Sequence, residues 1–152
     1  MKRLQISFPQ KSFFISSFGK DVYVVGGTVR DALLYKKKAP QRDIDLLVTG
    51  MTYDEIAARL DAFGKTDTVG KSFAVIKFTR LGRTFDIAVP RRDRRKDGAG
   101  HGHRNFLVQS GPEVSLEEDL GRRDFTCNSI AVRLSDGAVS DPHLGLPAIA
   151  QK

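Results

Sequence analysis

The sequence predicts an α+β fold in which a mixed sheet has helices packed on one face. Short apolar runs rich in β-branched residues mix irregularly with segments of helical periodicity. Hydrophobic residues make up 40% of the 152 residues, which is enough to bury a core. This length suits one domain with one core and is short for two.

The first elements are expected to be a short strand, a helix and a buried strand. Residues 3–7 are predicted to form an edge strand. The apolar segment from Phe13 to Phe18 predicts a helix that stops at Gly19. Val22 to Val25 has the β-branched composition of a buried strand, and Gly26-Gly27 then opens a helix. The apolar face of that helix is formed by Val29, Ala32 and Leu33.

The middle of the chain predicts three strands and one helix. Ile44 to Val48 is the first strand, and Thr52 with Glu55 forms a capping box for the helix that follows. Ala74 to Thr79 and Thr84 to Val89 predict two further strands. The buried face of the helix is expected to comprise Tyr53, Ile56, Ala57 and Leu60.

The last third begins with a charged segment and ends in a hairpin. Residues 91–104, RRDRRKDGAGHGHR, contain little that could enter a core, so a mobile loop is expected there. Ser115 and Glu118 form a second capping box. A hairpin is expected to turn at Asp136-Gly137.

Composition favours a cytoplasmic protein with a polyanionic partner. The net charge is +7, from 25 basic and 18 acidic residues, which favours nucleic acid. The chain has no apolar stretch of eighteen residues and no secretory signal after Met1, so neither a membrane span nor export is expected. The single cysteine, Cys127, fits a reducing compartment and argues against a cysteine-based metal site.

A strand, two glycines and a helix form the first candidate for chemistry. In VYVVGGTVRD, Gly26 and Gly27 let the backbone approach a ligand closely. The N-terminus of the helix offers free N–H groups and a favourable dipole to phosphate, and Arg30 could grip a triphosphate. The alternative is a tight strand-to-helix turn with a solvated arginine.

A pair of aspartates at the start of a strand forms the second candidate. Asp43 and Asp45 are two residues apart, so on a strand they lie on one side, roughly 6.6 Å apart along the chain. Two such carboxylates suit a pair of Mg²⁺ ions about 3.5–4 Å apart, and Mg²⁺ prefers carboxylate oxygens. Asp86 on a later strand could complete the site. Exposed aspartates at a strand start, and an edge-strand aspartate, are the alternatives.

A polar motif after the second capping box forms the third candidate. Arg122 and Arg123 could hold a triphosphate near the end of a helix. Asp124 and Asn128 could hold a sugar or orient the arginines. An amphipathic helix with exposed charges is the alternative.

The order of these motifs resembles the family of class II CCA-adding enzymes and bacterial poly(A) polymerases. The resemblance covers about residues 20–147 and rests on GGTVRDALL, DIDLLVTG, FDIAVPRRD, GHRNF, DLGRRDFTCNSIA and DPHLG, in that order. No single motif is specific, but the ordered set is. The resemblance implies a polymerase-beta-like nucleotidyltransferase head.

The resemblance also implies roles for single residues. Asp43 and Asp45 match the family's two catalytic, metal-binding aspartates, and Asp86 matches an acidic position on the neighbouring strand. The implied cofactor is Mg²⁺. The implied nucleotide-binding residues are Gly26, Gly27, Arg30, Arg123, Asp124 and Asn128.

The same resemblance implies that the chain transfers C or A, from CTP or ATP, to the 3′ end of an RNA. The expected RNA is tRNA. CCA addition, CC or A addition alone, and poly(A) synthesis stay open, because all use this head. Residues 1–152 are expected to form the head alone, without the helical neck, body and tail of the family. Glu118-Asp119-Leu120-Gly121-Arg122 spells the neck's template pattern but lies inside another motif, so we do not interpret it as the template. An NTP-binding head with little activity alone, and an unrelated basic RNA-binding protein, are the alternatives.

Overall fold

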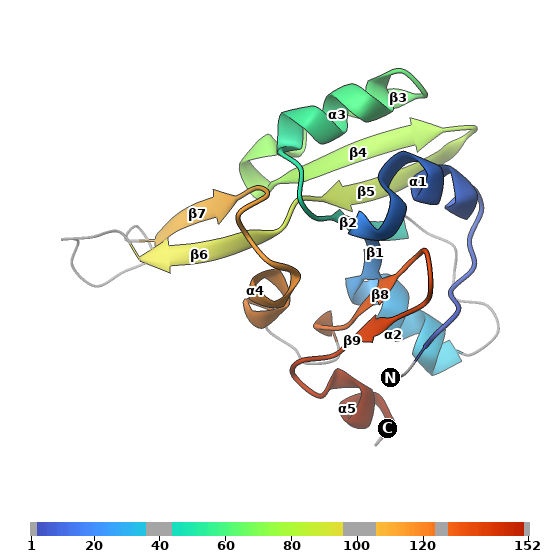
Figure 1. Ribbon diagram of the computed structural model, residues 1–152, viewed down its shortest axis with the longest axis vertical. Helices are drawn as coiled ribbons and strands as arrows, with labels where there is room; N and C mark the ends of the chain where they lie inside the picture. The colour runs from blue at the N-terminus through green and yellow to red at the C-terminus, as the bar shows by residue number, and fades with distance from the viewer. Residues whose placement is uncertain (1–2, 36–43, 96–105, 124–127, 151–152) are drawn as a thin grey trace.

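The computed structural model describes residues 3–35, 44–95, 106–123 and 128–150. Its main sheet is mixed and has seven strands in the order β3-β4-β5-β2-β1-β8-β9 (Figure 1). β2 pairs in parallel with β5, and the other pairs in the sheet are antiparallel. The strands of this sheet are β1 (Val22–Val25), β2 (Ile44–Val48), β3 (Lys65–Asp67), β4 (Val75–Arg80), β5 (Arg83–Ala88), β8 (Ala131–Arg133) and β9 (Val139–Ser140).

The helices follow the strands irregularly along the chain, which confirms the α+β class. They are α1 (Lys11–Phe18), α2 (Gly26–Tyr35), α3 (Tyr53–Asp61), α4 (Leu116–Gly121) and α5 (Gly145–Ala150), with short 3-10 turns at η1 (Gly19–Asp21) and η2 (Val69–Phe73). Within the described residues, none of these helices has the length and apolar character needed to cross a membrane.

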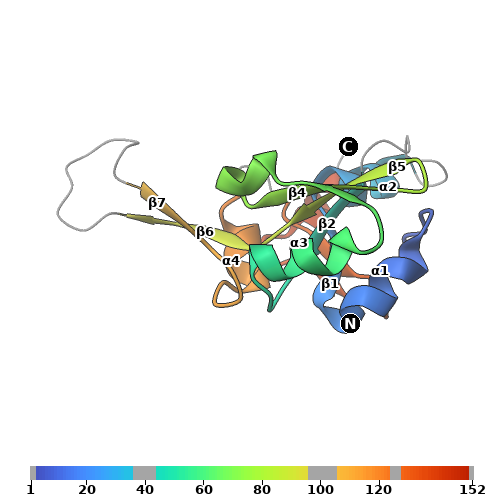
Figure 2. The same cartoon turned by 90° about the horizontal axis from the view of Figure 1, so that it is seen from above.

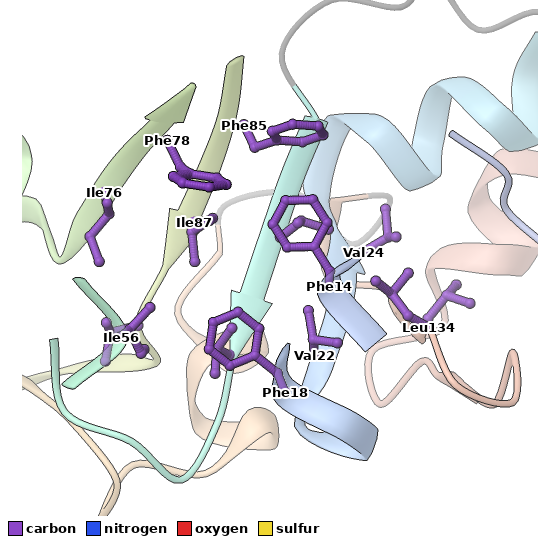
Figure 3. Packing of buried hydrophobic residues seen from close by; sticks show 14 of the residues in the cluster. Phe14, Phe18, Val22, Val24, Ile56, Ile76, Phe78, Phe85, Ile87 and Leu134 are labelled. Atoms are coloured by element: carbon purple, nitrogen blue, oxygen red, sulfur yellow. The ribbon is translucent and has the colours of Figure 1, made fainter. Parts of the chain in front are cut away.

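The larger core lies on one face of the sheet, under α1, α2 and α3. Alternate residues of the central strands point into it because successive side chains of a strand face opposite sides. Phe14 of α1 is fully buried there, and its ring lies 4.7 Å from that of Phe85 and 6.2 Å from that of Phe78 (Figure 3). The larger core therefore supports the sheet from one face, while other residues of the same strands point to the opposite face.

A smaller cluster lies on that other face and fixes α4. Leu116 and Leu120 of α4 pack against Tyr23 and Val25 of β1 and Leu47 of β2. The capping box at Ser115 and Glu118, as expected, starts this helix. Helix α4 therefore adds a packed element on the face opposite the larger core and brings the residues after it close to the ends of β1 and β2.

Two strands leave the main sheet as an arm. β6 (Arg91–Arg95) pairs antiparallel with β7 (Phe106–Ser110), and the hairpin projects away from the rest of the molecule (Figures 1 and 2). The expectation of a loop over residues 91–104 is therefore wrong for its first five residues. A strand pair is held by backbone hydrogen bonds, so a charged sequence can form one without supplying a core. Residues 96–105 lie outside the described part.

The remaining expectations at element ends are largely confirmed. Gly19 ends α1 with a φ of 60°, and Thr52 with Glu55 caps α3. The expected strand over residues 3–7 is wrong: Arg3 makes one isolated bridge to Ala138, and residues 4–8 have no regular structure. A short apolar stretch is enough to pack against the core, where Ile6 and Phe8 are buried, without joining the sheet.

Candidate functional site

The turn from β1 into α2 brings two glycines against two arginines and a carboxylate. Gly26 has a φ of 61°, a backbone angle that residues other than glycine rarely adopt. A Cβ on Gly26 would lie 3.3 Å from Nη1 of Arg123, and one on Gly27 would lie 3.3 Å from Nη2 of Arg30. Either Cβ would lie 3.8 Å from Oδ2 of Asp45. The turn thus presents backbone without side chains to two guanidinium groups and one carboxylate that lie close to it.

Asp45 is fixed by the first turn of α2. It lies half-buried on β2, and its backbone N–H donates to Oγ1 of Thr28 at 3.0 Å. The Thr28 hydroxyl in turn donates to Oδ2 of Asp45 at 3.5 Å. Thr28 was missed at the level of sequence, because nothing in its own neighbourhood signals a contact with a strand seventeen residues later.

Asp86 lies beside Asp45 on the neighbouring strand. The two residues are register partners in the parallel pair of β2 and β5, so their side chains start from the same face. Lys77 of β4 pairs with Asp86 at 3.0 Å. β5 lies between β4 and β2, so Asp86 is on an inner strand rather than an edge strand.

The metal site expected from the sequence is only partly described. Asp43 lies outside the described residues, directly before β2. Among the residues that are described, no three His, Cys, Asp or Glu side chains cluster as a metal site would require. The described donors that fit Mg²⁺ are the carboxylates of Asp45 and Asp86, which start from one face of adjacent strands. Of the two, Asp45 lies next to the glycine turn.

Arg30 and Asn128, predicted from separate motifs, meet in the structure. Nη1 of Arg30 donates to Oδ1 of Asn128 at 3.2 Å, and Nε of Arg30 donates to Asp31 at 3.0 Å. Asn128 therefore contacts the arginine of the first motif, whereas the sequence suggested that it could hold a sugar or orient Arg122 and Arg123. Asp124 lies outside the described residues.

Asp119 of α4 holds both arginines of the third motif. Its carboxylate is fully buried, and it accepts from Nη2 of Arg123 at 3.1 Å and from Nη2 of Arg122 at 3.2 Å. It also accepts the backbone N–H of Arg91 at 3.0 Å. Sequence reasoning missed this role. The signal was present: an aspartate followed by arginines three and four positions later on a helix places them on one face.

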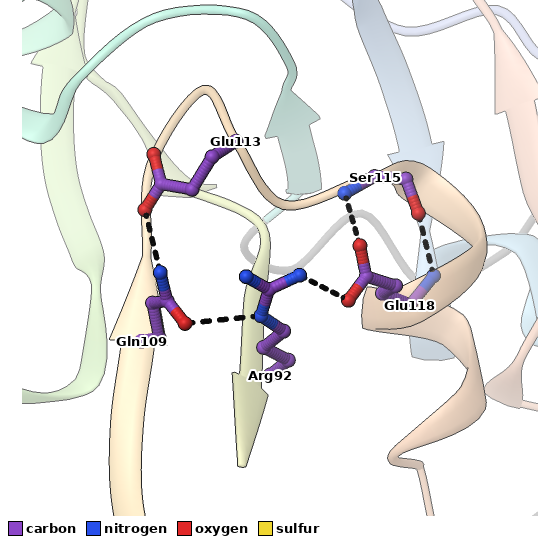
Figure 4. Close-up of polar contacts among 5 residues, drawn as sticks. All are labelled: Arg92, Gln109, Glu113, Ser115 and Glu118. Atoms are coloured by element: carbon purple, nitrogen blue, oxygen red, sulfur yellow. Dashed lines mark hydrogen bonds and ion pairs between the residues drawn. The ribbon is translucent and has the colours of Figure 1, made fainter. Parts of the chain in front are cut away.

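The base of the arm is fastened next to Asp119. Nη1 of Arg92 pairs with Glu118 at 2.6 Å, and Nε of Arg92 donates to Gln109 of the opposite strand at 3.1 Å (Figure 4). The hydrogen bond from Arg92, together with the backbone N–H of Ser115, lowers the pKa of the Glu118 carboxyl. One helix thus anchors the arm through Glu118 and the two arginines through Asp119.

This geometry is found in a chain whose sequence matches the poly(A) polymerase head domain over residues 22–152. The chain belongs to this family. The family resemblance stated from the motifs is thereby confirmed. Relatives of this head domain include the Multifunctional CCA proteins of Stenotrophomonas maltophilia strain K279a, 41% identical over 131 residues, and of Xanthomonas campestris strain B100, 42% identical over 131 residues. Each alignment covers 86% of this chain and 29% of the relative, so the chain spans less than a third of their length.

Solved structures agree with the fold of the head domain. A crystal structure of the Bacillus stearothermophilus CCA-adding enzyme in complex with CTP matches with a TM-score of 0.68 and 29% identity, over 95% of this chain and 32% of that one. A CCA-adding enzyme in apo form II matches with a TM-score of 0.73 and 28% identity, over 97% of this chain and 35% of that one. The polymerase-beta-like head predicted from the sequence is therefore confirmed.

Proposed function

We propose that this chain is the catalytic head of an RNA nucleotidyltransferase that adds C, A or both from CTP and ATP to the 3′ end of tRNA. The observation that carries the proposal is the meeting of two guanidinium groups and a strand carboxylate at the glycine turn. Relatives named Multifunctional CCA protein, and a related structure that holds CTP, favour this substrate class. Residues 1–152 would form the head, and the location would be the cytoplasm, where tRNA is processed in bacteria.

The glycine turn and its two arginines would bind the nucleotide. The open backbone at Gly26 and Gly27 admits phosphate oxygens close to the N-terminus of α2, where free N–H groups and the helix dipole favour negative charge. Arg123 and Arg30 would hold the triphosphate from its two sides, since each guanidinium already faces one of the glycines. Asn128 would keep Arg30 in this direction.

Asp45 would supply the acidic side of the site, with Asp43 before it and Asp86 beside it. Mg²⁺ bound by these carboxylates would neutralise phosphate charge and favour ionisation of the RNA 3′-hydroxyl. In the reaction, the 3′ oxygen forms a bond to the α-phosphorus, the bond from that phosphorus to the bridging oxygen breaks, pyrophosphate leaves, and the hydroxyl proton passes to solvent. Thr28 would keep the Asp45 carboxylate oriented throughout.

The test is incorporation of labelled CTP and ATP, with Mg²⁺, into tRNA that lacks its 3′ end. The chain is compared with its Asp43→Ala/Asp45→Ala variant, and with Asp54→Ala as a control. Asp54 is an exposed aspartate in the first turn of α3 that pairs at the surface with Lys71. We expect incorporation by the chain and by the control, and none by the double variant.

Each other result has a defined meaning. Equal incorporation by the double variant would overturn the assignment of the aspartates. CTP binding without incorporation by the unaltered chain would overturn catalysis by these residues alone and favour a nucleotide-binding head. Long tracts of A in place of a short addition would favour poly(A) synthesis.

A further inference from the structure

The carboxylate of Asp119 is buried between charged groups that belong to different parts of the molecule. Its exposed fraction is 0%, and burial of an ionised carboxylate is costly unless it is paired. Oδ1 accepts from the guanidinium of Arg122 and from the N–H of Arg91, and Oδ2 accepts from Arg123. Both carboxylate oxygens therefore accept hydrogen bonds in a buried network, unlike those of a surface ion pair.

The contact with Arg123 leaves the rest of that guanidinium directed at the glycine turn. Nη2 is held by Asp119 at 3.1 Å, while Nη1 lies 3.3 Å from the place of a Cβ on Gly26. Nε of Arg123 is buried and makes no hydrogen bond with any described residue. Within the described part of the chain, the polar contact that orients this guanidinium is therefore the one to Asp119.

The position of Asp119 is itself fixed. It lies on α4 between Leu116 and Leu120, which pack against β1 and β2. The strands that carry the glycine turn and Asp45 thus also set the position of the carboxylate, through an apolar contact. A guanidinium is planar and its donors form a rigid fork. The bond from Nη2 to Asp119 therefore restricts where Nη1, the nitrogen at the glycine turn, can lie.

We propose that Asp119 is a positioning residue that holds Arg123 ready for the nucleotide, and this rests on the proposed function for the nucleotide itself. Asp119 does not touch the substrate; it acts through Arg123. The same carboxylate fastens the first residue of the arm, so the orientation of Arg123 and the base of the arm depend on one group.

The first measurement needs no nucleotide. In the ¹⁵N-labelled chain, the Nε–Hε resonance of Arg123, identified by its loss in Arg123→Met, should be that of an ordered side chain. In Asp119→Asn it should shift and lose its order. The matched control is Glu118→Gln, which makes the same isosteric change one residue earlier and keeps the capping interaction. An Arg123 signal unchanged in Asp119→Asn would overturn the proposal.

The second measurement is the dissociation constant of CTP with Mg²⁺, by calorimetry. We expect a rise of about tenfold in Asp119→Asn and no change in Glu118→Gln. The double variant Asp119→Asn/Arg123→Met should bind like Arg123→Met alone, because residues that act as one unit do not add. Multiplied losses in the double variant, or unchanged affinity in Asp119→Asn, would overturn the proposal.

Two outcomes are separated by design. If Asp119→Asn does not fold, Asp119→Glu is measured in its place, because it keeps the charge but displaces the carboxylate. It should also disorder the Arg123 signal and weaken CTP binding. Wild-type behaviour of Asp119→Glu would overturn the proposal. If Arg123 is released in Asp119→Asn but the unaltered chain binds no CTP, the positioning stands and the proposed function fails.

Discussion

A methyl group on Gly26 would lie 3.3 Å from Nη1 of Arg123, closer than most real contacts of a Cβ atom. Gly26 also has a φ of 61°, where a side chain is strained. Crowding at the site and strain of the backbone therefore coincide at this glycine. Gly19 separates the two effects, because its φ is 60° and no atom lies within 4 Å of its Cβ position.

We expect both Gly26→Ala and Gly19→Ala to lower the free energy of unfolding, by on the order of 1 kcal/mol or more, because both glycines have a positive φ. Only Gly26→Ala should weaken CTP binding, by about tenfold, because only there does the new methyl group displace Arg123. Urea denaturation and calorimetry with CTP measure the two effects. If Gly26→Ala binds CTP as tightly as Gly19→Ala does, the nucleotide binds away from this turn.

Thr28→Val should slow nucleotide incorporation with little loss of fold. The change removes the hydroxyl that accepts from the N–H of Asp45 and donates to its carboxylate, at a cost of about 1 kcal/mol. We expect a rate about tenfold lower, measured with saturating CTP. Thr49→Val is the control, since the Thr49 hydroxyl donates to the carbonyl of Asp21 in an exposed hydrogen bond. A rate unaffected by Thr28→Val would mean that Asp45 needs no support from α2.

The ion pair between Lys77 and Asp86 should affect how much Mg²⁺ the reaction requires. An ammonium 3.0 Å from Asp86 competes with a metal ion for the same carboxylate. Lys77→Met should therefore lower the Mg²⁺ concentration that gives half-maximal incorporation, and Asp86→Asn should raise it, each by a few-fold. A titration of activity with Mg²⁺ measures both. Unchanged midpoints in the two variants would exclude Asp86 from the metal site.

The Glu118 carboxyl predicts how stability depends on pH. Its pKa in the folded protein is below the ordinary value of 4.5, because Arg92 and the Ser115 N–H stabilise the charged form. A lowered pKa gives stability that is present above the unfolded value and is lost as the pH falls through the folded one. Glu118→Gln should therefore be less stable than the wild type at pH 7. The difference should shrink as the pH falls below about 4.5, as followed by thermal denaturation. A difference that stays constant with pH would contradict this cause.

The elements that local signals specify were predictable. Gly19 ends α1, and the pairs Thr52 with Glu55 and Ser115 with Glu118 begin α3 and α4, because each signal acts within one turn of the chain. The apolar strands were predictable for the same reason. Their order in the sheet was not, because the parallel pairing of β2 with β5 depends on contacts between distant segments.

The residues of the candidate site were predictable where they belong to motifs that are visible in the sequence. Arg30 and Asn128 were both expected to serve the nucleotide, and they prove to be hydrogen-bonded to each other. Thr28 was missed because its contact with a strand exists only after folding. The role of Asp119 was overlooked although its spacing from Arg122 and Arg123 is visible in the sequence. The strand at Arg91–Arg95 was missed because its charged side chains carry no apolar alternation, whereas its pairing uses only the backbone.

The place of β8 in the sheet has a consequence for how the protein is made. β8 is the neighbour of β1, and Asn128 just before it orients Arg30, yet both are encoded in the last quarter of the sequence. During synthesis, β1 therefore remains an open edge until Ala131–Arg133 has left the ribosome, and open edges attract other strands. The proposed nucleotide site would be completed only after Asn128 has been added. Until β8 is in place, the unfinished chain is expected to be prone to pairing with strands of other chains.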